Sequence, residues 1–535
     1  MAQYTREDLE KLSSEELRLL VLSQQDQLTR LNNNIEALIE QIRIANVSRF
    51  GRKSEKLDVY EKQMSLFNEA ESLSDESLPE PSEEEVIVVR RKKQKGKRDA
   101  DLDGFEEEDH PHMIPEEKLD AFFGKGNWRE LPSETFKRLR YVPASWIVEK
   151  HTVGVYVGTD GENQDVFLRG DRPKDILRNS IVTPSLGAAI LNGKYTNSLP
   201  LYRIEQEFER NGISISRQTM ANWVIEFSKY FEPLWFRMKE KLLSLPVTQA
   251  DETTVDVVRD GRVAGSKSYM WVHRSGEFYK ETPIVLYEYQ KTRHHDHPKE
   301  FYKDYHGVLV TDGLQQYHML ESMITGLTNA NCWAHARRDF SDACKAIGKT
   351  NPAMKTSTAY QALQLIQAIY EEDNKLKELG SEERLQGRQA KVKPLVEAYF
   401  AWVREQLSDQ KHLPKGKTME GLRYSLNQEP YLKVFLENGD VPIDNSASER
   451  SIRTFCIGRN NWVLINTIKG AQASAVIYSL SETAKLNNLN IYEYFRKLLE
   501  ELPTRKNEDG NIDPSTLDDL LPWSETIQNE CRKRR

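Results

Sequence analysis

Residues 247–258 read VTQADETTVDVV, and this stretch decides the fold class. Its β-branched residues predict a strand, and similar patterns predict further strands at 269–273, 284–289 and 308–311. Helices are predicted at 333–345, through most of 355–410, and near 419–437, 446–455, 471–487 and 491–501. Strands followed by a long helical stretch indicate an α/β domain with an interruption.

Two aspartates in this region are candidates for chemistry. Asp251 lies inside the first strand, where a buried carboxylate without a partner is costly. Neighbouring side chains of a strand alternate faces, so Asp251 and Glu252 are not expected to face one site. Asp312 follows the apolar strand 308–311, at the strand end where sites on α/β sheets gather. An Asp-Gly turn is the alternative interpretation of Asp312.

Glu449 is the third candidate, in the stretch 446–453 (SASERSIR). Ser446 and Glu449 match the S-x-x-E capping box, and Arg453 stands one turn later, so a purely structural role is the alternative. The spacing of the three acids does not decide between chemistry and structure.

A helix–turn–helix is predicted upstream of these strands. Residues 201–210 (LYRIEQEFER) have one apolar helical face, Asn211 and Gly212 break the helix, and Ser216 stands where the N-cap of a second helix belongs. In this motif the start of the second helix reads base edges in the major groove, and the residues there are Arg217, Gln218, Thr219 and Asn222. An ordinary helical hairpin is the alternative.

The first 45 residues carry a heptad seam. Its positions are Leu17, Val21, Gln24, Leu28, Leu31, Ile35, Leu38 and Ile42. Steps of four and three keep one stripe facing a partner helix, which predicts self-association through a coiled coil. An amphipathic helix packed on its own domain is the alternative.

Charge is unevenly distributed along the chain. The net charge is −8, and residues 69–85 hold eight acids and no base, so the remainder sums to zero. Basic clusters stand at 90–98 and 532–535; they permit phosphate binding, although a solvated tail is the alternative. Residues 69–110 are interpreted as a linker, and their composition predicts disorder. Short apolar runs at 146–148 and 153–157 predict a small β-rich module.

Other features exclude several classes of protein. No run of about 18 apolar residues suggests a membrane span, and acids stand where a secretion signal needs an apolar stretch. All four cysteines follow position 331, which argues against a disulfide framework and suits a reducing cytoplasm.

Six segments carry a resemblance to a known family. They are LPLYRIEQEFERNGISISRQTMANW (199–223), DETTVDV (251–257), VLVTDGLQQYH (308–318), NCWAHARRDF (331–340), DNSASERSIRTFCIGRNNWVL (444–464) and SAVIYSLSETAKLNNLN (474–490). In this order they resemble the transposases of insertion-sequence family sixty-six, the TnpC type. The resemblance runs from the N-terminal zipper nearly to the end of the chain.

The resemblance implies a DDE transposase with an RNase H-like core that a helical insertion interrupts. Carried over residue by residue, the catalytic and metal-binding triad is Asp251, Asp312 and Glu449. Two Mg²⁺ ions, with Mn²⁺ able to substitute, would activate the attacking oxygen and stabilise the leaving oxygen during DNA cleavage and strand transfer. The implied partners are the terminal inverted repeats, target DNA and a second copy of the chain or a higher oligomer. Accessory proteins of the same element are compatible with the resemblance.

Residues around the triad receive secondary roles. A DNA grip is expected from Arg337, Arg338, Arg450, Arg453 and Arg459, with ion pairing on helix faces as the alternative. Cys332 and His335 form a C-x-x-H pair that related transposases also show; two ligands do not make a zinc site, so a structural role is expected and no zinc. The histidines at 294, 295 and 297 are interpreted as a solvated loop.

One departure concerns the region before the helix–turn–helix. Many relatives carry a cysteine-rich zinc module there, whereas residues 1–331 contain no cysteine. A DNA contact by the β-rich module is therefore in doubt.

The expected parts follow one another along the chain. They are a coiled coil (1–50), a charged linker (51–110), a β-rich module (111–172), a helical region with the helix–turn–helix (173–245), the first part of the core (246–345), the helical insertion (346–440), the core completion (441–500) and a C-terminal tail (501–535). A DNA-binding regulator without catalysis is the alternative function, and a nuclease without strand transfer is a second one.

Overall fold

The computed structural model of the protein describes most of the chain after residue 180. The described residues are 13–15, 17–18, 21–22, 24–25, 115–123, 125, 145–157, 167–169, 176–177 and 180–533, except residues 264, 349–350 and 409–412. The chain divides into two units. The larger unit contains Ile176–Cys531, which includes all the candidate site residues.

The smaller unit contains little regular structure in its described residues. These form helix α5 (Glu116–Phe123) and an antiparallel pair of strands, β1 (Val155–Val157) and β2 (Phe167–Arg169). The predicted strand at 146–148 is wrong, because these residues have no regular structure and Ile147 is 84% exposed. Val148 is 93% exposed as well.

The N-terminal seam is described only in part. Leu17, Val21 and Gln24 are helical, and Val21 is 52% exposed. The later seam positions and the predicted linker lie outside the described residues, so the coiled coil stays a prediction.

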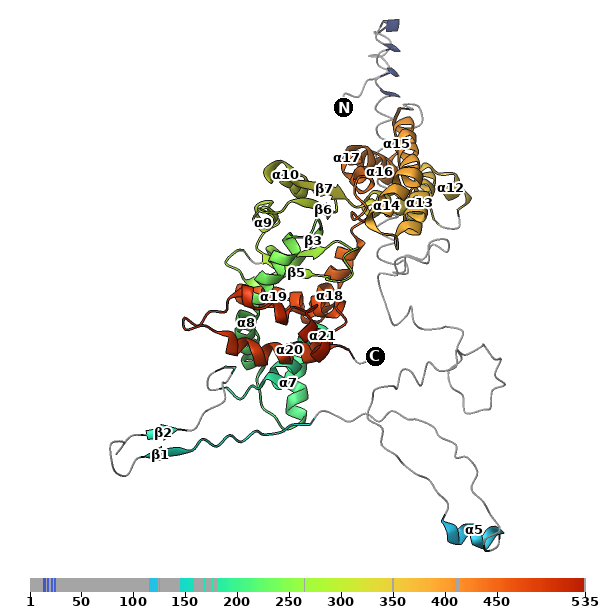
Figure 1. Ribbon diagram of the computed structural model, residues 1–535. Coiled ribbons are helices and arrows are strands. Elements are labelled where there is room, and N and C mark those ends of the chain that lie inside the picture. The colour runs from blue at the N-terminus through green and yellow to red at the C-terminus, as the bar shows by residue number, and fades with distance from the viewer. Residues whose placement is uncertain are drawn as a thin grey trace. The chain divides into compact units, whose positions relative to one another are not determined.

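A mixed sheet forms the centre of the larger unit (Figure 1). Its strands are β3 (Val247–Arg259), β4 (Lys267–Ser275), β5 (Val285–Gln290), β6 (Gly307–Thr311), β7 (Leu327–Asn331) and β8 (Ile465–Thr467). The order is β5-β4-β3-β6-β7, and β8 pairs with the far end of β3. The β3–β4 and β4–β5 pairs are antiparallel, whereas β6 runs parallel to both β3 and β7. The α/β prediction is confirmed, and β7 is a strand that it missed.

Helix α19 (Ile468–Leu486) covers the edge strand β5, and Figure 1 shows the two side by side. Backbone N–H groups of β5 donate to its side chains: Tyr287 to Ser479 Oγ at 2.7 Å and Val285 to Thr483 Oγ1 at 3.0 Å. An edge strand presents unpaired backbone groups, and these hydroxyls satisfy two of them. Helix α8 (Arg217–Leu243) packs against α19 and β5, so the sheet and these helices share one core.

The two helices predicted at 201–222 form a hairpin ahead of the sheet. Helix α7 (Leu201–Arg210) ends at Asn211, and Gly212 supplies the φ of +78° that the turn needs. Ser216 caps α8, because its Oγ accepts the Thr219 N–H at 3.1 Å. Upstream lie α6 (Pro184–Leu191) and the short π-helix η1 (Asn192–Thr196).

A helical segment lies between the sheet and the last helices in the chain (Figure 1), and its core also includes Val247, Val310 and Ala330 of the sheet. It follows α11 (Trp333–Ile347) and contains α12 (Pro352–Thr356), α13 (Thr358–Leu376), α14 (Ser381–Gly387), η2 (Arg388–Val392), α15 (Lys393–Ser408), α16 (Gly416–Asn427), α17 (Glu429–Lys433) and η3 (Val434–Leu436). The fully buried ring of Trp333 contacts Tyr399, Phe400 and Phe435. This core ties the helical segment to the start of α11.

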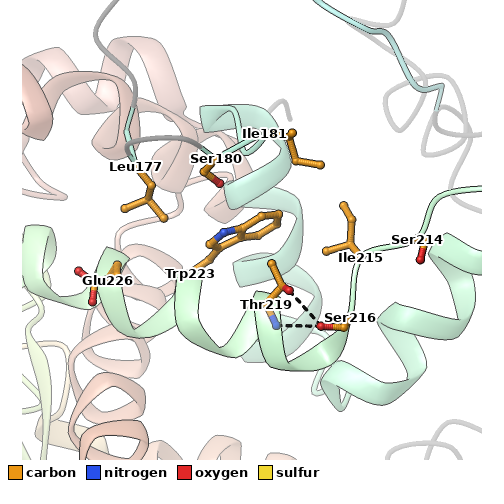
Figure 2. A pocket seen from close by; sticks show the side chains of 9 residues that line it. All are labelled: Leu177, Ser180, Ile181, Ser214, Ile215, Ser216, Thr219, Trp223 and Glu226. Carbon is orange, nitrogen blue, oxygen red and sulfur yellow. Dashed lines mark hydrogen bonds between the residues drawn. The ribbon is translucent and has the colours of Figure 1, made fainter.

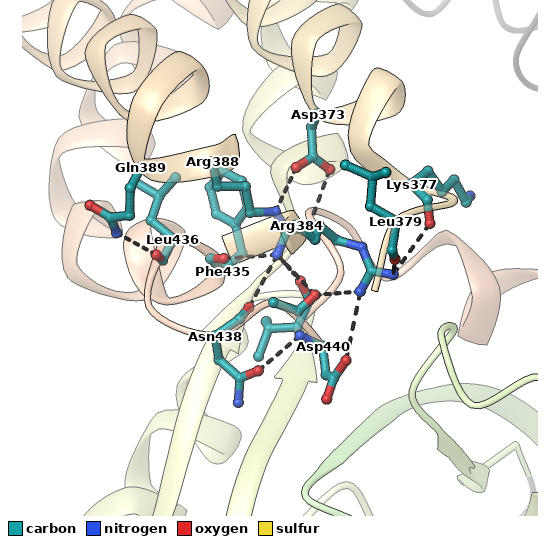
Figure 3. A network of polar contacts seen from close by, with 12 residues as sticks. Asp373, Lys377, Leu379, Arg384, Arg388, Gln389, Phe435, Leu436, Asn438 and Asp440 are labelled. Carbon is teal, nitrogen blue, oxygen red and sulfur yellow. Dashed lines mark hydrogen bonds and ion pairs between the residues drawn. The ribbon is translucent and has the colours of Figure 1, made fainter. Parts of the chain in front are cut away.

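Two buried arginines fix the chain where it leaves this segment (Figure 3). Arg388 is fully buried, pairs with Asp373 at 2.6 Å, and donates to the carbonyl oxygens of Phe435 and Val441 at 2.9 and 2.8 Å. Arg384 donates to the carbonyl oxygen of Gly439 at 2.6 Å. The path of residues 435–441 is thereby set before the chain enters α18 (Ser446–Trp462).

The C-terminal residues pack back onto the core. After α20 (Ile491–Glu501) come three short 3₁₀ turns and α21 (Glu525–Cys531), and Tyr494 Oη donates to the carbonyl oxygen of Leu520 at 3.0 Å. Leu517, Leu520 and Ile527 are buried. None of the helices described in this chain combines the length and apolar composition that a membrane crossing needs.

Candidate functional site

Asp251 and Asp312 meet at the carboxyl end of β6. The parallel pairing runs from Val247 opposite Val308 to Gln249 opposite Val310. Continued by two residues, this register sets Asp251 beside Asp312. Carboxylate oxygens of both residues and of Glu252 lie within 4.8 Å of one another. The structure therefore brings together the two aspartates that the sequence singled out.

Glu252 joins this cluster, although strand alternation predicted otherwise. The prediction was wrong because β3 loses its β6 neighbour after Gln249. Past that point the strand edge is open, and the longer glutamate side chain reaches the aspartates from the other face. Two neighbours hold its carboxylate: Arg293 Nε donates to Oε1 at 2.6 Å, and Tyr317 Oη on α10 (Gln315–Met323) donates to Oε2 at 2.6 Å.

Asp312 also makes the turn that the sequence suggested as an alternative. Its Oδ1 accepts the N–H of Leu314 at 3.0 Å, and Gly313 has a φ of +82°. Tyr424 Oη, from α16, donates to the Asp312 carbonyl oxygen at 3.0 Å. Turn and site therefore use the same residue, because a turn bond occupies only part of the acceptor capacity of a carboxylate.

Replacing Gly313 by alanine is expected to destabilise the protein by clearly more than the usual cost of a positive φ. A Cβ there would lie 2.5 Å from Tyr424 Oη and 2.9 Å from Asn331 Nδ2, in addition to the strain of the left-handed backbone. The matched control is Gly261→Ala, whose φ is +83° and whose Cβ would meet nothing within 4 Å. We expect Gly261→Ala to lower the free energy of unfolding by about 1 kcal/mol and Gly313→Ala by more, measured by urea unfolding. Equal losses would contradict the crowding at Gly313.

Asn445 joins β3, which carries Asp251, to Cys332 and to the start of α18, which carries Glu449. Its Nδ2 donates to the carbonyl oxygen of Ala250 at 2.8 Å, and its Oδ1 accepts from Gln249 Nε2 at 3.1 Å. Its backbone N–H donates to Cys332 Sγ at 3.1 Å. Asn445, Gln249 and Cys332 are fully buried. These three hydrogen bonds, called the Asn445 bracket below, hold the start of α18 against β3 one residue before Asp251. They also give Cys332 a structural contact.

Glu449 lies on the first turn of α18. The capping box predicted as an alternative does not form, because the N-cap is Asn445 and its side chain makes no cap bond. Instead, Glu449 Oε1 lies 3.7 Å from Arg338 Nη2 and 3.9 Å from His335 Nε2. This buried oxygen has no hydrogen-bond partner. Glu449, Cys332 and His335 present ligand atoms within 4.8 Å of one another.

The charges of these acids act on each other. Burial, and then the charges of Glu252 and Asp312, raise the pKa of Asp251 well above its usual value, and Glu449 adds to the effect. Burial also raises the pKa of Glu449, against the opposing charge of Arg338 and with the support of Asp312. The pKa of Glu252 is raised by burial, although Tyr317 and Arg293 oppose the shift. Glu449 therefore lies within electrostatic reach of both aspartates.

The donor set fits a hard divalent cation. Carboxylate oxygens are the protein ligands of Mg²⁺, and the clustered acids repel one another in the absence of a cation. The unpartnered Oε1 of Glu449 is a further oxygen donor, but it groups with Cys332 and His335 and not with the cluster of Asp251, Glu252 and Asp312. The thiol of Cys332 fits a metal less well, because burial raises its pKa well above the usual value and a thiolate is the form that binds metals.

The predicted DNA-contacting arginines near Glu449 differ in their surroundings. Arg338 is 57% exposed and approaches Glu449, whereas Arg450 pairs with Glu277 at 3.3 Å. Arg459 bonds to Thr253 Oγ1 at 3.1 Å and to the Thr254 carbonyl on β3. Arg337 and Arg453 lie on the same two helices and have contacts within the protein. Arg459 thus makes hydrogen bonds to neutral groups of β3, a structural contact that the sequence did not suggest.

The histidine loop lies next to Arg293. His294 and His295 approach Asp296 at 3.0 and 3.5 Å, and the side chain of His294 is 56% exposed. His297 Nε2 lies 2.8 Å from Thr292 Oγ1.

The start of α8 presents most of the predicted base-reading residues to solvent. Arg217, Gln218 and Asn222 are exposed, and Gln218 Nε2 donates to Asn222 Oδ1 at 3.2 Å. Thr219 is half-buried and lines a cavity of about 740 Å³, together with Leu177, Ser180, Ile181, Ser214, Ile215, Ser216, Trp223 and Glu226 (Figure 2). Thr219 also lies 3.0 Å from the capping Ser216 Oγ. Three of the four predicted residues thus share an open surface, and Thr219 faces the cavity.

Sequence reasoning missed Glu252, Asn445, Gln249, Tyr317 and Arg293. Asn445 stands beside Asp444 in a quoted motif, which was the available signal. The contacts of Tyr317 and Arg293 with Glu252 span 65 and 41 residues, and local patterns do not reveal such contacts.

Comparisons with known proteins identify the family of the chain. Residues 179–473 match the family model described as Transposase IS66 family, residues 479–523 match the IS66 C-terminal element, and residues 37–108 match the model described as Transposase C of IS166 homeodomain. Two uncharacterized proteins of Sinorhizobium fredii, y4jD and y4qI, are each 26% identical to the chain. The alignments cover 75% and 72% of this chain and 76% and 70% of those proteins. The chain therefore belongs to the IS66 family of transposases, which act on DNA.

Proposed function

We propose that this transposase cleaves and joins DNA with Asp251, Asp312 and Glu449 as a DDE triad on an RNase H-like core. The observation that carries the proposal is the meeting of Asp251 and Asp312 at neighbouring parallel strands, with Glu449 in electrostatic reach of both. Two features support the RNase H-like interpretation. The sheet has three antiparallel strands followed by two parallel ones, and a helical segment precedes α18, the helix that carries Glu449.

The three carboxylates would hold two Mg²⁺ ions, or Mn²⁺ in their place. When bound, these ions would activate the attacking oxygen and stabilise the leaving oxygen in an in-line displacement at phosphorus. Asn445 keeps the glutamate helix in register with β3, so that the acids from three segments act on one phosphate. The exposed guanidinium of Arg338 beside Glu449 binds a neighbouring phosphate.

Each chemical step exchanges one P–O bond for another. In the first, water attacks a phosphate at the end of the element; a new P–O bond forms, the P–O3′ bond breaks and one proton of the water passes to the leaving oxygen, which gives a 3′-hydroxyl and a 5′-phosphate. In the second, that 3′-hydroxyl attacks a phosphate of target DNA and forms a new P–O3′ bond. The target's own P–O3′ bond breaks, and the proton of the attacking hydroxyl passes to the leaving 3′ oxygen. No protein nucleophile is required in either step.

The parts of the chain divide the work. Residues 1–50 form the dimerising coiled coil, 51–110 the linker, 111–172 the β-rich module and 173–245 the DNA-recognition region. Residues 246–345 and 441–500 form the catalytic core, 346–440 the helical insertion and 501–535 the C-terminal part. The terminal inverted repeats are bound by the exposed start of α8, and the protein acts in the cytoplasm as a dimer or larger assembly.

Arg217→Ala is expected to weaken binding to the terminal repeats by about 10-fold or more, because a bidentate base contact contributes about 1–3 kcal/mol. Arg217 is exposed at the start of α8, and its guanidinium lies 5.7 Å from the ring centre of Tyr202. The measurement is fluorescence anisotropy with a terminal-repeat duplex and with a scrambled duplex, and Mn²⁺ binding should not change. Arg210→Ala, an exposed arginine at the end of α7, is the matched control. Equal losses on both duplexes would contradict base reading by Arg217.

Cleavage and joining assays test the proposed function as a whole. The substrate is a duplex containing the DNA that flanks the gene, incubated with the full chain and Mg²⁺, Mn²⁺ or EDTA. We expect divalent-dependent nicking at the repeat end, and joining of a pre-cut 3′ end to a second duplex. Binding without nicking would favour a DNA-binding regulator, and nicking without joining would favour a nuclease; either result overturns the proposal.

A further inference from the structure

Glu252 is a buried acid beside the triad to which the proposed chemistry gives no role. Its side chain is only 1% exposed, and its carboxylate lies within 4.8 Å of those of Asp251 and Asp312. An ionised carboxylate is costly to bury unless it is paired, hydrogen-bonded or bound to a metal. Placing it beside two more acids adds repulsion to that cost.

Two neighbours hold Glu252 without saturating it. Arg293 donates to Oε1 and Tyr317 donates to Oε2, each at 2.6 Å. A carboxylate has about four acceptor positions. Both Nε and Nη2 of Arg293 contact Oε1, so the acceptor position that these two neighbours leave free lies on Oε2. Tyr317 is itself fully buried, and its ring meets that of Trp271 edge-on at 5.9 Å, which fixes the hydroxyl that orients Glu252.

The balance of charge favours a cation next to Glu252. Arg293 contacts Glu252, and Arg338 approaches Glu449, so two acids have a basic neighbour. The carboxylate of Asp251 accepts only a backbone N–H, that of Glu252, at 2.8 Å among the bonds described for it, and Asp312 accepts that of Leu314. The space between these aspartates and Glu252 is therefore strongly negative.

We propose that Glu252 is a fourth carboxylate ligand of the divalent-cation centre, with Tyr317 and Arg293 as its positioning residues. This inference rests on the proposed function, since it adds a ligand to the same cation site. It makes the two adjacent acids of β3 work together, one from each face of the strand, where the strand edge is open.

Mn²⁺ binding by the full chain in the absence of DNA tests the inference, measured by isothermal titration calorimetry. We expect Tyr317→Phe to weaken Mn²⁺ binding by about 10-fold, as loss of a group that orients a ligand does, and Glu252→Gln to weaken it further. Glu429→Gln is the matched control: Glu429 is 13% exposed and also held by two basic side chains, Arg404 and Lys433, but lies on α17. The control should bind Mn²⁺ like the unaltered protein.

Asp251→Asn separates this inference from the proposed function. If Asp251→Asn loses Mn²⁺ binding while Glu252→Gln retains it, the fourth ligand is refuted and the triad stands. If Asp251→Asn keeps the affinity of the unaltered protein, the proposed cation site itself fails. Circular dichroism checks the fold of each variant; should Glu252→Gln not fold, unchanged affinity in Tyr317→Phe refutes the inference instead.

Discussion

Asp251→Asn is expected to reduce divalent-dependent DNA cleavage by at least about 1000-fold, because bound metal ions contribute several kcal/mol to such reactions.

The same substitution should raise the unfolding temperature in EDTA at pH 7. Burial and the neighbouring acids raise the pKa of Asp251 in the folded protein. An acid with a raised pKa contributes stability below its unfolded pKa, near 4, and that contribution is lost as pH rises through the folded pKa. Because pH 7 lies above the unfolded pKa, the raised pKa of Asp251 opposes folding there, and asparagine removes that opposition.

Asp256→Asn provides the control for both measurements. Asp256 lies on the same strand and is exposed, so cleavage and unfolding temperature should stay close to those of the unaltered protein. An Asp251→Asn protein that cuts DNA normally would remove Asp251 from the proposed triad. A lower unfolding temperature for Asp251→Asn would show that this carboxylate supports the fold instead.

Asp373→Asn is expected to lower the free energy of unfolding by about 3–5 kcal/mol, the usual cost of breaking a buried ion pair from one side. Its partner Arg388 is fully buried, and Asp373 is 6% exposed, so the arginine charge would remain without its counter-charge. Urea unfolding followed by tryptophan fluorescence measures the loss, since Trp333 lies in the same core.

Glu372→Gln is the matched control for this ion pair. Glu372 is the preceding residue of α13 and pairs with Lys375, whose side chain is 65% exposed. Exposed pairs of this kind contribute about 0–1 kcal/mol. If both variants lost the same small amount of stability, the Asp373–Arg388 pair would not be the anchor of the helical segment that its burial indicates.

The sequence predicted most elements of the larger unit, because their patterns are local. Strand 247–258 and the helices at 201–210 and 491–501 depend on periodicity and caps, which neighbouring residues determine. Strand β7, with the sequence LTNAN, was missed because its buried asparagines look like loop residues. Asn329 Nδ2 donates to the carbonyl oxygen of Leu309 and to Thr311 Oγ1, and both lie on the neighbouring strand β6.

The candidate site was predictable in its acids but not in its supports. Asp251 and Asp312 stood out through their motifs, and the resemblance selected Glu449. Glu252 was set aside because successive side chains of a strand point to opposite faces, whereas the approach of its carboxylate to the aspartates, beyond the end of the β6 pairing, is a tertiary feature. The Asn445 bracket joins residues almost two hundred positions apart, beyond the reach of any pattern in the sequence.

The grip of Arg384 and Arg388 on residues 435–441 has a consequence for how this protein can evolve. Both arginines bind carbonyl oxygens there, so side chains of this segment that lie outside the core can change while its course stays the same. Phe435, Leu436 and Val441 are constrained by burial in the core, and Gly439 by backbone, because any Cβ would lie 1.9 Å from the carbonyl oxygen of Ser381. Homologues should therefore conserve the length of this segment, its apolar positions and this glycine.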